Sequence, residues 1–259
     1  MPRTKNLCPA ERDLNDSLSR WLERAPGAAL AELERECLER LLADRFGYYL
    51  VQIGCAGLQA GPLKASRIRD QFIVTPQRLE GVLCPRIQGE LSRLPIASDS
   101  VDVALLPHTL DFAAEPHLVL REVERILIPE GRVILIGFNP WSFWGLWRGL
   151  FTRRRAVPWC GHFISPLRVQ DWLNLLGFDV EILENLMFRP PLRQPALLDR
   201  LHFLEPAGRR FWPLLSAVYV IQAVKRVSTL TPIAPRWKLR ERLVGGGMIE
   251  PTAREQGHG

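Results

Sequence analysis

The chain has 259 residues, of which 47% are hydrophobic and 24% are charged, and its net charge is +6. This composition is ordinary for a globular protein that can bury a full core. The longest apolar run, residues 214–224, is too short to cross a bilayer. The five cysteines are scattered without a C-x-x-C or Cys/His cluster, which argues against a disulfide framework or a metal site and favours the cytoplasm.

The first third of the chain predicts helices followed by short strands. Apolar residues recur at helical spacing through residues 14–46, and Pro26-Gly27 is expected to divide this region into two helices. We assign residues 1–46 to an N-terminal helical extension. Apolar runs at 48–53 and 71–74 predict two buried strands, and residues 81–85 predict a short third strand.

Residues 89–139 contain the clearest pattern of the chain. The run VDVALL at 101–106 predicts a buried strand, and apolar residues at helical spacing between 114 and 127 predict an amphipathic helix. Pro129, Glu130 and Gly131 end this helix, and the β-branched run at 132–138 predicts the next strand. Strand, helix and strand in this order indicate a βαβ unit with parallel pairing.

The second half predicts two insertions between the remaining elements. Residues 140–164 are rich in tryptophan and arginine, and residues 184–216 are rich in proline and arginine. Between them, Ser165 and Pro166 predict the start of a helix that Gly177 ends. Strands are predicted at 178–183 and 217–225. We assign residues 47–226 to one α/β domain and expect the polar, basic tail at 227–259 to be disordered.

A series of short motifs runs in a fixed order through residues 89–139. They are Gly89-Glu90, Leu94-Pro95-Ile96, the DSVDV run at 99–103, His108-Thr109-Leu110, Glu122, Arg125-Ile126-Leu127 and Pro129-Glu130-Gly131. In this order they resemble the class I S-adenosylmethionine-dependent methyltransferases, in particular the small-molecule type called methyltransferase type 11. The resemblance implies a doubly wound, seven-stranded, mostly parallel sheet and S-adenosyl-L-methionine as cofactor.

The resemblance also implies where the cofactor is held. The family has a glycine-containing turn after the first strand, which lets the backbone approach the cofactor closely. The residues at that turn are Gln52, Gly54, Cys55, Ala56 and Gly57; Gln52 stands where the family has an acid, and Ala56 where it has its second glycine. The adenine contacts fall on Gly89, Glu90 and Leu91. The last two residues expected to contact the cofactor are Pro107 and His108, at the end of the fourth predicted strand.

One position departs from the family pattern. The family ends its second strand with an acid that accepts hydrogen bonds from the ribose hydroxyls. Ile73 holds that place here, with Thr75 close by. Loss of a charge-assisted acceptor typically costs about 1.5–3 kcal/mol, which is one to two decades in affinity.

The acceptor is expected over the carboxyl ends of strands four and five, as in other open α/β sheets. His108 is a candidate catalytic base there, and Asp111 is a second candidate that could instead cap the next helix. Asn139, Trp141 and Trp144 are candidates for the wall of a pocket for a flat or apolar small molecule. Two alternatives stay open for the tryptophans: burial in the core, or an amphipathic segment at a membrane surface.

The sequence therefore favours a cytoplasmic methyltransferase that acts on a small molecule. A second hypothesis is a catalytically impaired binding or regulatory protein of the same fold, which the isoleucine at the ribose position favours. A third is modification of RNA, which rests on the many basic residues of the second half; a solvated basic face is the simpler interpretation of that charge.

Overall fold

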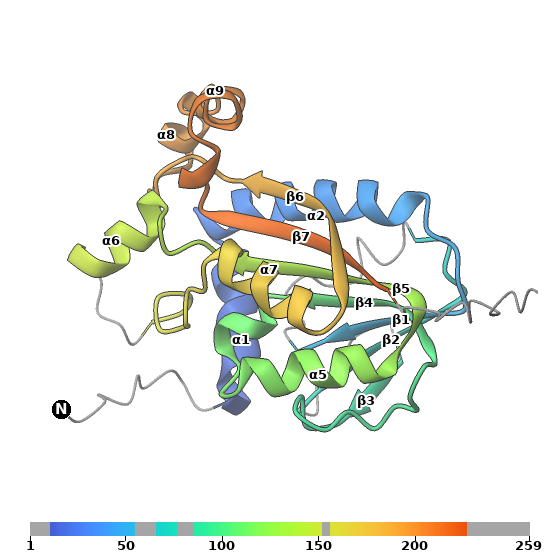
Figure 1. Ribbon diagram of the computed structural model, residues 1–259. Helices are drawn as coiled ribbons and strands as arrows, with labels where there is room; N and C mark the ends of the chain where they lie inside the picture. Colours follow the sequence, from blue (N-terminus) through green and yellow to red (C-terminus); the bar gives the residue numbers. More distant parts are fainter. Residues whose placement is uncertain (1–10, 55–65, 77–84, 152–155, 227–259) are drawn as a thin grey trace, which may run out of the picture. The chain divides into compact units, whose positions relative to one another are not determined.

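Seven strands form one mixed sheet in the computed structural model, which describes residues 11–54, 66–76, 85–151 and 156–226. Their order is β3-β2-β1-β4-β5-β7-β6 (Figure 1). The strands are β1 (Tyr49–Ile53), β2 (Asp70–Thr75), β3 (Arg86–Gln88), β4 (Val101–Pro107), β5 (Leu127–Phe138), β6 (Phe178–Leu186) and β7 (Val218–Lys225). Only β7 runs antiparallel to its two neighbours. This topology confirms the predicted doubly wound α/β fold.

The described helices lie before and between the strands in the sequence. They are α1 (Glu11–Leu22), α2 (Gly27–Ala43), α4 (Thr109–Phe112), α5 (Pro116–Ile126), α6 (Phe143–Phe151), α7 (Pro166–Leu175), α8 (Pro195–Arg200) and α9 (Leu204–Phe211), with a 3-10 turn η1 (Pro213–Leu215). The predicted division of the N-terminal extension is confirmed, because α2 begins at Gly27.

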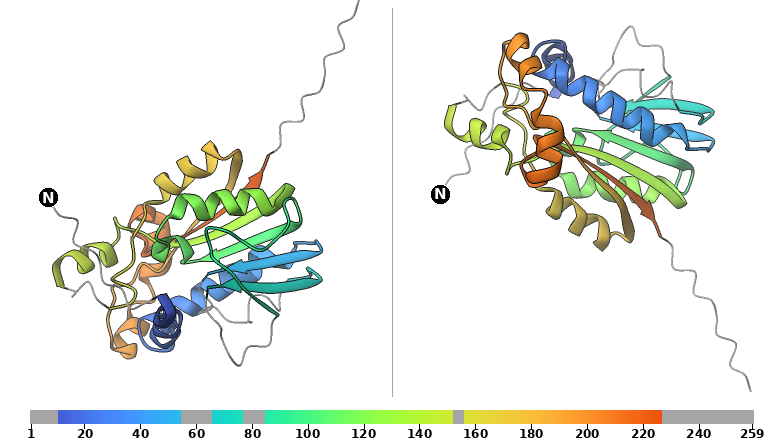
Figure 2. Two further views of the ribbon diagram at one scale, coloured as in Figure 1. Left: turned by 90° about the horizontal axis from the view of Figure 1, so that it is seen from below. Right: turned by 90° about the horizontal axis from the view of Figure 1, so that it is seen from above.

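Helices cover both faces of the sheet (Figure 2), and apolar side chains fill the space between them and the strands. On one face, buried residues of α5 and α7, such as Val123 and Val169, pack against Val51 and Leu135 of the strands. On the other face, the apolar stripe of α2 packs against the alternate residues of the same strands. The N-terminal extension therefore supplies one of the two helical layers of the sheet.

Several local expectations were wrong or incomplete. The third described strand is Arg86–Gln88; of the predicted range 81–85, only Pro85 is described and it is not in a strand, and the other four residues lie outside the described part of the chain. Ser165 does occupy the N-cap position of α7, but its side chain makes no capping hydrogen bond. The turn expected at 129–131 lies inside β5, where the pairing skips from Leu127 to Arg132. The tail at 227–259 lies outside the described residues.

The cysteines differ from the sequence expectation in one respect. Cys160 is disulfide-bonded, which the scattered pattern did not predict. Cys37 is a buried free thiol on α2. Among the described residues, no helix is long and apolar enough to cross a membrane.

Candidate functional site

The first strand ends in a tight turn that only glycine fits. Gly54 has a φ of +87°, and its N–H donates to the carbonyl of Val74, 2.8 Å away. A Cβ atom at this position would lie 2.6 Å from Cγ2 of Thr109. The Thr109 hydroxyl in turn donates to the Ile53 carbonyl at 2.5 Å, so the ends of β1 and β4 are held together. Gly54 is therefore required both by its positive φ and by its close contact with Thr109. Cys55, Ala56 and Gly57 lie outside the described residues.

The ribose position is apolar in the structure. Gln52 of β1 pairs in register with Ile73 of β2 and with Leu105 of β4. Gln52 and Ile73 are fully buried, and Thr75 is 1% exposed. Because an isoleucine side chain accepts no hydrogen bond, this position does not fit the family's contact to the ribose. The positive φ of Gly54 agrees with the predicted glycine turn, whereas the end of β2 lacks the expected carboxylate.

The expected adenine contacts lie on the loop between β3 and β4. Gly89 packs closely on Pro95, since an added Cβ would lie 2.6 Å from the proline Cδ. Glu90 is exposed and accepts a hydrogen bond from the hydroxyl of Ser92. Leu91 is partly buried against the core. The loop thus presents one carboxylate and one apolar side chain at the edge of the sheet.

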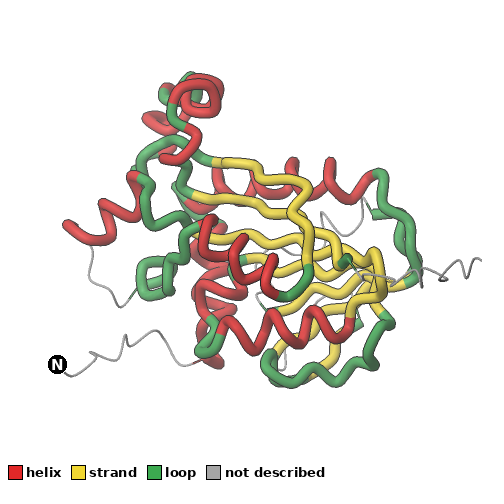
Figure 3. The backbone as a smooth tube through the Cα atoms, viewed as in Figure 1, coloured by secondary structure: helices red, strands yellow, loops and turns green. Residues whose placement is uncertain are grey.

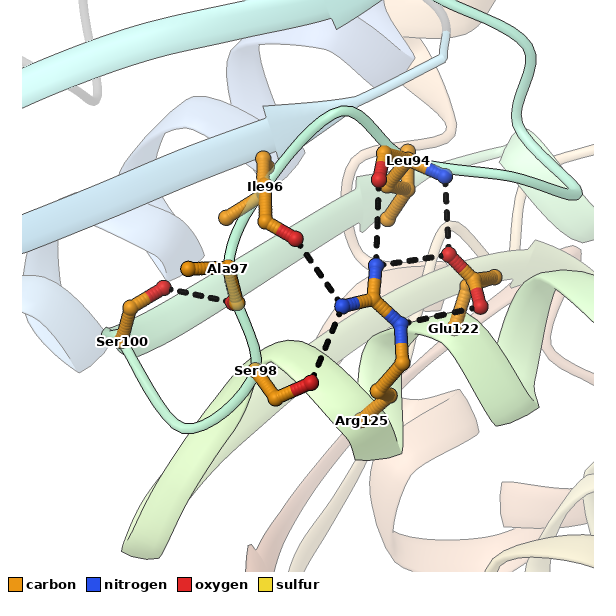
Figure 4. Close-up of polar contacts among 7 residues, drawn as sticks. All are labelled: Leu94, Ile96, Ala97, Ser98, Ser100, Glu122 and Arg125. Carbon is orange, nitrogen blue, oxygen red and sulfur yellow. Dashed lines mark hydrogen bonds and ion pairs between the residues drawn. The ribbon is translucent and has the colours of Figure 1, made fainter.

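A clamp from α5 fixes the next part of this loop (Figure 4). The Arg125 guanidinium donates to the carbonyls of Ile96 at 2.9 Å and Leu94 at 3.0 Å. Glu122 accepts from the Leu94 N–H at 2.8 Å and pairs with Arg125 at 2.9 Å. The hydrogen bonds of Arg125 lower the pKa of Glu122, against a smaller opposing effect of burial. Glu122 and Arg125, two of the motif residues, therefore act by holding the loop in place.

His108 is buried between two carboxylates from different parts of the chain. Its Nε2 lies 2.9 Å from Oε1 of Glu34 on α2, and its Nδ1 lies 3.1 Å from Oδ2 of Asp111. All three side chains are at most 1% exposed. His108 has a φ of +52°, and its ring stacks on Phe138 at 4.2 Å. The imidazole therefore links the N-terminal extension to the end of β4.

The charges of this cluster follow from its geometry. Burial alone would lower the pKa of His108, but Glu34 and Asp111 outweigh it and raise the pKa to about 9. Burial raises the pKa of Asp111, although His108 and the Phe138 N–H act against this shift. An imidazolium with both N–H groups engaged has no lone pair to accept a proton. This geometry argues against His108 as the base, and Asp111 serves to hold His108 and the Phe138 N–H.

The three residues expected around the acceptor have different surroundings. Trp144 is fully buried, and its Nε1 donates to the Arg189 carbonyl at 2.8 Å, so it belongs to the core. Asn139 is 2% exposed and donates to the carbonyls of Leu214 and Ser216. Trp141 is 73% exposed. Of the two open alternatives, burial in the core applies to Trp144.

A cavity of about 820 Å³ lies beside this core, and none of the three predicted wall residues, Asn139, Trp141 and Trp144, lines it. Its walls include the side chains of Trp21, Trp147, Trp159, Arg24 and Arg193. Trp21 and Trp159 also pack on Trp144, with ring centroids 5.9 Å and 5.8 Å away. The cavity therefore adjoins the aromatic cluster at the end of β5, on the side where open α/β sheets bind their ligands.

Comparison with known proteins gives consistent matches. A methyltransferase domain family model matches residues 54–135. The uncharacterized protein YafS of Escherichia coli (strain K12) is 32% identical over 204 residues, which are 77% of this chain and 79% of that protein. The demethylmenaquinone methyltransferase of Chlamydia pneumoniae is 26% identical over 99 residues, 36% of this chain and 41% of that protein.

Solved structures share the fold. A crystal structure of an S-adenosylmethionine-dependent methyltransferase from Thermotoga maritima superimposes with a TM-score of 0.58 at 20% identity. The superposition covers 83% of this chain and 98% of that one. At this level of identity the likeness concerns the arrangement of the strands and helices.

Proposed function

We propose that this chain, which belongs to the class I S-adenosylmethionine-dependent methyltransferases, methylates a small molecule that carries a flat ring and a negative charge. The observation that carries the proposal is the cavity at the end of β5, where three tryptophans and two arginines meet. Aromatic walls suit a ring, and guanidinium groups suit an anion. One relative, the demethylmenaquinone methyltransferase, is also named for a small-molecule acceptor.

The buried histidine cluster supports an acceptor of this charge. When bound, the cofactor supplies a methyl group on a sulfonium, which is attacked by a lone pair. Because both nitrogens of His108 are engaged by carboxylates, this residue has no free lone pair with which to take a proton from the acceptor. An acceptor that is already deprotonated needs no base, and Arg24 and Arg193 would favour that form. Catalysis would then rest on alignment of the two substrates.

The chain's own residues would hold the cofactor at the carboxyl edge of β1 and β4. The turn at Gly54 would bring the backbone close to it, and the loop clamped by Arg125 would present Glu90 and Leu91 to the adenine. The apolar Ile73 would weaken the ribose end of this contact. We therefore expect cofactor binding in the micromolar range, weaker than that of relatives with the acid.

Calorimetric titration with S-adenosylmethionine and S-adenosylhomocysteine tests the cofactor site. We expect Ile73→Asp to bind about ten to a hundred times more tightly than the wild type, and Ile73→Val to match the wild type. Circular dichroism would check that both variants fold. Binding by Ile73→Asp alone would favour the impaired, regulatory alternative. If neither the wild type nor Ile73→Asp bound the cofactor, the assignment of this edge as a cofactor site would be contradicted.

A fluorescent aromatic anion, 8-anilinonaphthalene-1-sulfonate, tests the acceptor cavity without the cofactor. The Arg24→Gln/Arg193→Gln variant should bind it at least tenfold more weakly, because each guanidinium contributes a charge-assisted contact. The control is Arg168→Gln, which removes an exposed arginine 5.5 Å from the Trp172 ring, outside this cavity. Equal binding by all three proteins would argue against the cavity. If the double variant binds more weakly as expected, a screen of aromatic acids for release of S-adenosylhomocysteine would identify the acceptor.

A further inference from the structure

Two segments at the carboxyl end of the sheet expose large apolar side chains. One is α6 with the turn before it, and the other runs from the end of α9 through η1 (Figure 3). The exposed residues are Trp141 at 73%, Phe143 at 52%, Leu146 at 60%, Phe211 at 70%, Trp212 at 51% and Leu214 at 70%. We call these six residues the rim patch. Single exposed apolar residues are common, but such a group marks an interaction surface.

The two segments are neighbours in the structure. Asn139 donates from its side chain to the Leu214 carbonyl at 2.8 Å and accepts from the Trp141 N–H at 3.0 Å. Phe143 and Trp212 both line one apolar cavity of about 480 Å³. The two segments of the rim patch are therefore adjacent, although they are about seventy positions apart in the sequence.

A buried ion pair holds this surface in place. Arg189 donates to Glu205 of α9 at 3.0 Å and to the Leu198 carbonyl of α8 at 3.3 Å. The carbonyl of Arg189 accepts the indole N–H of Trp144 in α6. One residue thus connects α6, α8 and α9, so the rim patch is preorganised and not a loose segment.

The charges around the rim patch are almost all positive. Arg209 and Arg210 are exposed on α9, next to Phe211. The sequence has no Asp or Glu between residues 131 and 170. Between residues 185 and 216 it has only Asp199 and Glu205, and Glu205 is buried against Arg189. Glu184, which lines a small cavity together with Arg209, is paired with Arg40. The apolar surface therefore lies in a basic surround.

We propose that the rim patch docks on the surface of a bilayer that contains anionic lipids. Tryptophan and phenylalanine favour the boundary between headgroups and acyl chains, and arginine binds the anionic headgroups. Contact would be peripheral, since no helix among the described residues could span a bilayer. A second copy fits this surface less well, because a two-fold interface would bring the arginines of both copies together.

Sedimentation with vesicles tests the proposal on the full chain without any cofactor. We expect binding to an equal mixture of phosphatidylcholine and phosphatidylglycerol, and much weaker binding to phosphatidylcholine alone. Trp141→Ala/Phe211→Ala/Leu214→Ala should weaken binding at least tenfold, because three inserting side chains are lost. Arg209→Gln/Arg210→Gln should weaken it about 25-fold, at about fivefold for each charge near the surface.

A matched variant controls for loss of apolar surface as such. Phe46→Ala/Tyr48→Ala/Leu175→Ala removes side chains of similar exposure, 71%, 69% and 78%, outside the rim patch. It should bind vesicles like the wild type. Equal weakening by both triple variants, or no vesicle binding by the wild type, would overturn the proposal. So would binding to a single-stranded RNA but not to vesicles, or self-association that only the rim variant loses.

Discussion

The charge of His108 makes a specific prediction about stability and pH. The pKa of His108 is about 9 in the folded chain and about 6.5 in an exposed histidine. Because this pKa is raised in the fold, protonated His108 stabilises the folded chain fully below pH 6.5. This stabilisation is lost as the pH rises through 9. The difference of about 2.5 pH units corresponds to about 3 kcal/mol. For a domain of this size, losing this stabilisation would lower Tm by about 6–12 °C.

The comparison that isolates this effect is His108→Gln. The variant should lose about 3–5 kcal/mol at pH 6.5, because Glu34 and Asp111 stay buried without their cation. Its free energy of unfolding should then change much less between pH 6.5 and pH 9 than that of the wild type. Urea unfolding at a series of pH values measures both quantities. His117→Gln, which removes an exposed histidine on α5, should keep the wild-type slope.

Two results would refute this reasoning. One is a wild-type stability that stays level or rises between pH 6.5 and pH 9. The other is a slope that His108→Gln leaves unchanged, since other groups would then cause it. Either would mean that His108 is neutral in the fold, and the argument against its role as a base would fail with it.

Three further changes probe the other fixed parts of the site. Arg125→Ala should lower the free energy of unfolding in urea by about 1.5–3 kcal/mol and weaken cofactor binding, because the clamped loop loses its hydrogen-bond donors. Arg121→Ala, which removes an exposed arginine of the same helix, should change neither quantity. Gly54→Ala should lower Tm and abolish cofactor binding in calorimetry, since the turn needs a positive φ; an unchanged titration would contradict the assigned turn. Glu205→Ala should cost about 3–5 kcal/mol in urea unfolding by leaving Arg189 buried and unpaired; a loss under about 1 kcal/mol would show that the pair is not structural.

The sequence alone predicted the sheet and most of its elements. Period-two and continuous apolar runs located β1, β2, β4, β5, β6 and β7, because buried strands must place hydrocarbon on both faces. Gly177 ends α7 as expected, with a φ of +84°. The spacing of Leu94-Pro95, Glu122 and Arg125 indicated the family, and the clamp now gives these residues a physical reason to occur together.

The surroundings of the site residues could be seen only in the tertiary structure. Glu34 carried one signal, a charge within the apolar stripe between Leu30 and Leu38, but the stripe does not say which group faces it. That group is His108, 74 residues away, and the contact with Glu34 raises the pKa of His108, which argues against its expected role as a base. Burial and charge pairing depend on which distant residues meet, and local periodicity contains no information about those contacts.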